Sequence, residues 1–159
     1  MSESARDMLR HTVATLAYRG AKAIRGAPPG FGDFQASRTS RTPSQILSHI
    51  CDLMDWALTQ ARGKQAWTDT TPEGWEEDSA RFFTALRALD DYLATREPLG
   101  YEPGQIFQGA IADALTHVGQ INFLRRMFGH PVRGENYFRA DIATGRVEAD
   151  QAAPRREFD

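Results

Sequence analysis

Four stretches with the helical period of 3.6 residues, separated by proline and glycine, constrain the fold of this chain more than any other feature. They run from about 4 to 23, 43 to 63, 71 to 97 and 103 to 128. No alternating pattern typical of a strand competes with them. Amphipathic helices of this length bury their apolar faces best against one another, so the sequence predicts an all-α four-helix bundle.

Local signals indicate where these helices begin and end. Thr42-Pro43-Ser44-Gln45 predicts a capping box with a first-turn proline. Thr71-Pro72-Glu73 predicts a similar start for the third helix, and Gly129-His130-Pro131 predicts the end of the fourth. The connection between the first two helices is long and the next is moderate, so a crossover topology and a simple up-and-down topology both fit.

Length and composition limit the class of protein. The 159 residues are the usual size of one domain, so we expect a single domain over 1–159 with an irregular tail from about residue 130 that lies over the bundle and then frays. The formal charge of -2 gives little attraction for nucleic acid. No apolar run approaches the roughly 20 residues that span a bilayer. A lone cysteine, Cys51, and a polar start, Met1–Asp7, favour a cytoplasmic protein.

Polar residues interrupt the apolar faces of two helices. His49 lies three residues after Ile46 and four before Leu53, which tilts it toward the buried face. Asp113 and His117 occupy positions of the fourth stripe where leucine would serve stability better. Because four residues turn a helix through about 400°, both side chains leave one face, one above the other.

This spacing allows two interpretations. Two imidazoles and one carboxylate from facing helices form a facial ligand set that suits zinc, nickel or iron, which predicts that His49, Asp113 and His117 hold a divalent metal. An Asp–His pair four residues apart is also often a plain hydrogen-bonded pair. His11 falls off its stripe and His130 lies in a loop, so both are expected to be solvated.

The fourth helix contains Thr116-His117-Val118-Gly119-Gln120, followed by a Leu124-Arg125-Arg126 run that ends in Gly129. This motif resembles the last helix of the DinB-like superfamily, a group of four-helix proteins with metal sites, and Ser48-His49-Ile50 is similar to the family's first ligand. It extends over about residues 4 to 130. This resemblance implies a bundle with a crossover connection, often a homodimer, with zinc or nickel held by three histidines. Asp113 stands where the family has a histidine, which puts the identity of the metal in doubt.

The resemblance also implies a function. Characterised members of the family include thiol-dependent transferases and isomerases, so the first hypothesis is a metal-dependent transferase or hydrolase acting on a thiol or another small molecule. The alternative is a non-catalytic dimeric binding or interaction domain with a vestigial metal site. The tail segment Glu135-Asn136-Tyr137-Phe138 is expected either to close the pocket or to seal the end of the bundle.

Overall fold

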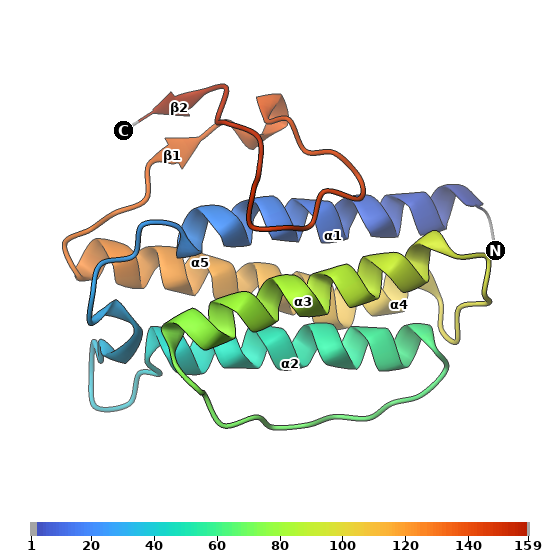
Figure 1. The fold of residues 1–159 in the computed structure, drawn as a ribbon, viewed down its shortest axis with the longest axis horizontal. Coiled ribbons are helices and arrows are strands. Elements are labelled where there is room, and N and C mark those ends of the chain that lie inside the picture. Colours follow the sequence, from blue (N-terminus) through green and yellow to red (C-terminus); the bar gives the residue numbers. More distant parts are fainter. Residues whose placement is uncertain (1–2, 159) are drawn as a thin grey trace.

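Four long helical segments lie side by side in the computed structural model, which describes residues 3–158 (Figure 1). The prediction of an all-α chain is confirmed. The segments are α1 (Glu3–Ile24), α2 (Pro43–Ala61), α3 (Trp75–Ala94), and a last one made of α4 (Pro103–Ile106), the π-helical turn η2 (Phe107–Ile111) and α5 (Ala112–Met127). Two 3-10 turns, η1 (Phe31–Asp33) and η3 (Tyr137–Arg139), and two short strands, β1 (Gly134–Glu135) and β2 (Glu157–Phe158), complete the described chain.

The apolar faces of all four segments meet in one core. Leu16, Ile50, Leu86 and Ile121, one from each segment, are fully buried there. Each of α1 and α2 packs mainly against α3 and α5. Burying a side chain of this size stabilises the fold by about 1.5–3 kcal/mol relative to leaving it in water. The helical period read from the sequence is therefore the pattern that builds the core.

Helices α2 and α3 run in the same direction, and the segment 62–74 that joins them returns along the length of α2 (Figure 1). Asp52 holds this segment in place, because its carboxylate accepts hydrogen bonds from the backbone N–H and the hydroxyl of Thr70, at 2.9 and 2.7 Å. Arg81 of α3 donates to the same carboxylate at 2.6 Å. One buried acid thus joins two helices to their connection.

The two predicted N-terminal caps have different outcomes. The capping box at Thr42 and Gln45 is confirmed, with both reciprocal hydrogen bonds present. The predicted start of the third helix at Thr71–Glu73 is wrong, since α3 begins at Trp75 with Gly74 as its N-cap. The preceding residues are extended, and the contacts that hold Thr70 to α2 carry the chain past the predicted start.

The π-helical turn η2 changes which face of the last segment is buried. Ile106 and Ala110 are buried as predicted, but after the turn the buried positions are Ala114 and Val118. A π turn places one extra residue in the helix, so the buried stripe moves by one position over the next two turns, while Ile121 and Leu124 further along are buried as predicted. Asp113 and His117 therefore lie beside the core, not within it as their predicted stripe positions implied.

The tail beyond residue 130 lies over α1 (Figure 1). Its Val147 is fully buried, and β2 pairs antiparallel with β1, with Gly134 opposite Phe158. The expectation that the tail frays is wrong over the described residues, because its end is paired; Asp159 lies outside them, as do Met1 and Ser2. Between residues 3 and 158, no helix has both the length and the hydropathy needed to cross a bilayer.

Arg125 connects the end of α5 to the end of α1. Its guanidinium donates to the backbone oxygens of Ala23 and Arg25, at 2.8 and 2.9 Å, and to the oxygen of His130 at 3.1 Å. These oxygens are carbonyl groups that helix ends leave free, so Arg125 joins the two helices through their backbones and not through an ion pair.

Candidate metal centre

His49, Asp113 and His117 come together at the face where α2 meets α5. His49 Nε2 lies 3.7 Å from Asp113 Oδ2, and His117 Nε2 lies 3.4 Å from the same oxygen. The two imidazole rings stand edge to face, with centroids 4.7 Å apart. One ligand atom from each residue lies within 4.8 Å of the other two. The structure thus brings together the three side chains that the sequence singled out.

These separations match atoms that share an ion better than atoms that share a proton. Nitrogen–oxygen hydrogen bonds in proteins are about 2.7–3.2 Å long, shorter than both His–Asp distances. Two ligands held about 2.1 Å from one tetrahedral ion are about 3.4 Å apart. In the described chain, no lysine, arginine or hydroxyl group hydrogen-bonds to these three ligand atoms. The two His–Asp separations are therefore compatible with a small divalent cation.

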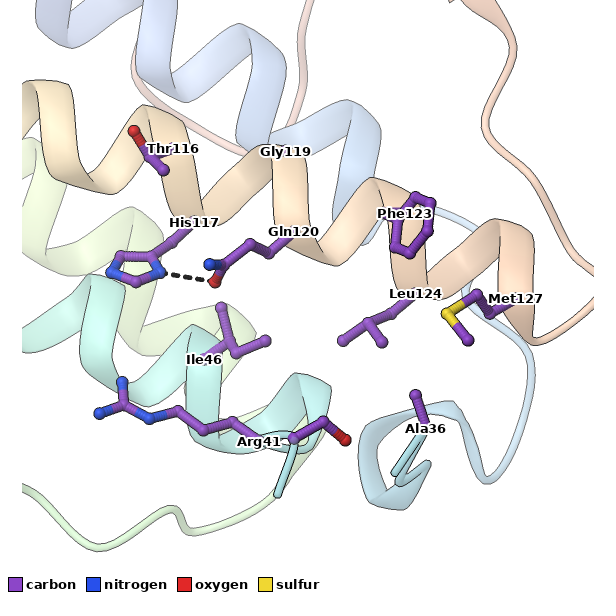
Figure 2. A pocket seen from close by; sticks show the side chains of 11 residues that line it. Ala36, Arg41, Ile46, Thr116, His117, Gly119, Gln120, Phe123, Leu124 and Met127 are labelled. Atoms are coloured by element: carbon purple, nitrogen blue, oxygen red, sulfur yellow. Dashed lines mark hydrogen bonds between the residues drawn. The ribbon is translucent and has the colours of Figure 1, made fainter. Parts of the chain in front are cut away.

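Gln120 orients the imidazole of His117. Gln120 lies one helical turn after His117, and its Oε1 is 2.8 Å from His117 Nδ1 (Figure 2). With this oxygen as the acceptor, Nδ1 carries the hydrogen, so the lone pair of Nε2 faces Asp113. A partner of this kind, on the nitrogen that does not bind, fixes the tautomer in most metal-binding histidines.

An aromatic wall holds His49 from the other side. The rings of His49 and Trp67 are 5.6 Å apart, and Trp67 stands perpendicular to Trp56 at 5.8 Å. Burial lowers the pKa of His49, and the neighbouring His117 and Arg41 lower it further, while Asp113 opposes the shift. The shift favours the neutral imidazole, which is the form that binds metals.

Asp113 differs from the prediction in its exposure. Its side chain is 48% exposed, against 23% for His49 and 14% for His117. The sequence placed Asp113 on the buried stripe of its helix, and that prediction is wrong, because the π turn moves the side chain to the rim. Its hydrated position leaves one side of the cluster open to solvent.

A groove of about 700 Å³ begins at His117 and runs between α5 and the start of α2 (Figure 2). Its walls are largely apolar and include Ile46, Phe123, Leu124 and Met127. A smaller hollow of about 220 Å³ lies on the other side of the cluster, beside His49. Arg41 lines both. The candidate centre therefore has space for a ligand on two sides.

The other residues weighed from the sequence lie away from this centre. His11 is exposed, and His130 contacts Arg125 at 3.0 Å. Cys51 is buried, which raises the pKa of its thiol to about 12 and makes it a poor nucleophile. The tail segment Glu135–Phe138 packs against α1, where Glu135 accepts from Tyr18 and Lys22. The expectation that it closes the pocket is wrong.

Sequence reasoning missed two parts of the site. Arg41 precedes a helix cap and carries no spacing signal that connects it to the histidines. Trp67 lies in an extended connection whose path depends on the Asp52–Thr70 contacts. Gln120 was named only within the motif that resembles the DinB-like superfamily, although its position three residues after His117 marks it as a neighbour on the same face.

Comparison with known proteins adds no identification at this point. No family model, curated protein or solved structure matches the chain. The resemblance of the fourth helix to the DinB-like superfamily therefore stays a prediction, and the functional interpretation depends on the geometry of the site.

Proposed function

We propose that the chain is a metal-dependent enzyme of the DinB-like type, a four-helix bundle with a crossover connection in which His49, Asp113 and His117 hold one divalent ion. Zinc and nickel suit two imidazoles and a carboxylate best, with iron as the alternative. The reaction class is thiol transfer or hydrolysis on a small-molecule substrate. The observation that carries the proposal is the convergence of three ligand atoms within 4.8 Å.

The protein's own groups support this function in distinct ways. When bound, the ion would supply a Lewis acid that lowers the pKa of a thiol or water in an open coordination position. Gln120 keeps the lone pair of His117 directed at the cluster, and burial keeps His49 neutral. The exposed side of Asp113 leaves an approach for a substrate, and the apolar groove beside His117 offers a surface for an apolar part of that substrate.

The metal content of the purified protein tests the proposal. After reconstitution with zinc or nickel and removal of free ions, we expect roughly one equivalent per chain in the wild type. The His117→Ala variant removes a ligand atom, so its content is expected to fall below about a tenth of an equivalent. Elemental analysis by mass spectrometry measures both.

His11→Ala is the matched control, because it removes an exposed imidazole remote from the cluster. It is expected to retain the wild-type metal content. Equal metal content in wild type and His117→Ala, at any level, would show that the three side chains do not form the site.

A second candidate function is the dimeric interaction domain, and one surface favours it. Met8 of α1 is 64% exposed, and Phe107 is 39% exposed across a largely apolar hollow of about 360 Å³. Exposed apolar groups that cluster in this way are typical of interaction sites. Sedimentation of wild type and Met8→Ser tests it: a dimer that the substitution weakens supports an interface here, and a monomeric wild type excludes the homodimer.

A further inference from the structure

We propose that the groove between α2 and α5 binds a small amphipathic organic anion, with its apolar body against Phe123, Leu124 and Met127 and its carboxylate paired with Arg41. The inference rests on the proposed function, since it names the substrate class of that site. A groove of about 700 Å³ is within the range of about 300–1,000 Å³ that small-molecule sites occupy.

The apolar half of the ligand follows from the walls of the groove. Phe123 is 62% exposed and Met127 is 50% exposed on the outer side of α5, beside the buried Leu124 (Figure 2). Ile46 of α2 forms the opposite wall. Exposing large apolar side chains next to a concave surface is unfavourable in water, and an apolar ligand would remove this surface from solvent.

The charge of the ligand follows from Arg41. Arg41 is the one lysine or arginine among the described residues that line the groove or the smaller hollow beside His49. No hydrogen bond or ion pair within residues 3–158 involves its guanidinium, although its charge lowers the pKa of His49. The two acids of the smaller hollow have other donors, because Asp52 pairs with Arg81 and Asp69 accepts from Trp67. A planar guanidinium without a partner is suited to bind a carboxylate in a bidentate manner.

The orientation of the ligand follows from the order of these groups. His117 lies at the inner end of the groove, where Gln120 holds it, and Met127 lies at the far end (Figure 2). An anionic group near Arg41 would therefore place the adjoining atoms of the ligand beside the histidine cluster. Its apolar part would extend along α5 toward Met127.

Two fluorescent probes with one aromatic body test the charge requirement. 8-Anilinonaphthalene-1-sulfonate carries an anionic group in place of the carboxylate, and N-phenyl-1-naphthylamine lacks it. Because an ion pair at an exposed site contributes up to about 1 kcal/mol, we expect the wild type to bind the anionic probe about fivefold more tightly. Arg41→Gln is expected to abolish this preference without changing the affinity for the neutral probe, and Phe123→Ala to weaken both.

Arg38→Gln is the matched control, because Arg38 is exposed in the same connection and does not line the groove. Equal affinity for the two probes, a preference that survives Arg41→Gln, a comparable loss in Arg38→Gln, or no saturable binding would each overturn the proposal. The titrations use chelator-treated and zinc-loaded full-length protein whose metal content is measured. Probe selectivity without metal uptake would support the ligand proposed for the groove and refute the metal centre. Metal uptake without probe selectivity would refute the ligand proposed for the groove and leave the metal centre intact.

Discussion

Two polar clusters border the core, and they differ in whether the protein supplies both donors and acceptors. Between α1 and the tail, Lys22 donates to Glu135 at 2.7 Å and to Glu157 at 2.9 Å, and Tyr18 donates to Glu135 at 2.6 Å. Between α2 and α5, by contrast, the Nε2 atoms of His49 and His117 lie 3.7 and 3.4 Å from one carboxylate oxygen of Asp113, beyond the usual length of a hydrogen bond. The first cluster is complete by itself, and the second would be completed by the cation that we propose.

Burial separates a cluster that anchors the tail from a candidate binding site. The side chains of Lys22 and Glu135 are almost fully buried, so their charges must be satisfied within the protein. Asp113 is half exposed, so solvent or a ligand can satisfy it. Burial with matched partners therefore indicates a role in attaching the tail, while convergent acceptors beside an open groove indicate binding.

The largest expected effect comes from breaking the cluster of Tyr18, Lys22, Glu135 and Glu157, which we call the closed cluster. Glu135→Ala leaves the Tyr18 hydroxyl without its acceptor and leaves Lys22 paired with Glu157 alone, so we expect a loss of about 3 kcal/mol in the free energy of unfolding. Thermal denaturation should show a fall of about 10 °C in Tm. Glu148→Ala is the control, because its exposed pair with Arg87 should contribute less than about 1 kcal/mol. Similar losses in both variants would mean that the closed cluster does not anchor the tail.

The second effect comes from adding a divalent ion to His49, Asp113 and His117, which we call the open cluster. An ion that binds only the folded protein, at a hundredfold excess over its Kd, stabilises it by about 2.7 kcal/mol. Zinc should therefore raise the Tm of the wild type and of Glu135→Ala alike, since the clusters are separate. The rise should be absent in His117→Ala and reversed by a chelator. A rise that persists in His117→Ala would place the ion elsewhere.

A smaller effect is expected from Gln120, which orients the imidazole of His117. Gln120→Leu removes the acceptor for His117 Nδ1 while keeping most of the side-chain volume. We expect metal affinity to fall about tenfold, measured by competition with a chromophoric chelator. Thr116→Val lies next to His117 and removes only a hydroxyl that donates to the backbone of its own helix, so its affinity should not change. Unchanged affinity in Gln120→Leu would remove Gln120 from the site.

The smallest effect is a pH dependence of the closed cluster. Burial raises the pKa of Tyr18, and its hydrogen bond to Glu135 raises it further. A folded pKa above the unfolded value of about 10 gives a contribution that is fully present below pH 10 and is lost as the pH rises above it. Unfolding in urea at several values between about pH 9 and 11 should therefore show a steeper loss for wild type than for Tyr18→Phe, by up to about 1.4 kcal/mol per pH unit. Equal slopes would contradict the shift.

Much of the fold was predictable because it depends on neighbours along the chain. The capping box at Thr42 and the end of the fourth helix at Gly129 need only residues a few positions apart, and both are as predicted. The start of α3 was not predictable in the same way. A second Thr-Pro signal was present at Thr71, but distant contacts to Asp52 hold that segment extended, and they outweigh a local cap.

In the candidate site, too, the features that depend on neighbours along the chain were predictable, and those that depend on the folded structure were not. The spacing of Asp113 and His117 placed them on one helical face, and the structure has them there. Their meeting with His49 was predicted from general bundle packing, and the exposure of Asp113 was predicted wrongly, because the extra residue of the π turn gives no signal in a periodicity of 3.6. Whether the three side chains hold a metal stays a prediction.

The sequence alone determined that the chain is helical, where most helices begin and end, and which polar residues break the apolar stripes. Tertiary structure decided that Trp67 and Arg41 lie beside His49, that Arg125 binds the end of α1, and that the tail returns to pair with β1. The reason is the distance along the chain between the residues that interact. Helix period and capping arise within about one or two turns, whereas desolvation, ion pairing and the path of a connection depend on which surfaces meet after the chain has folded.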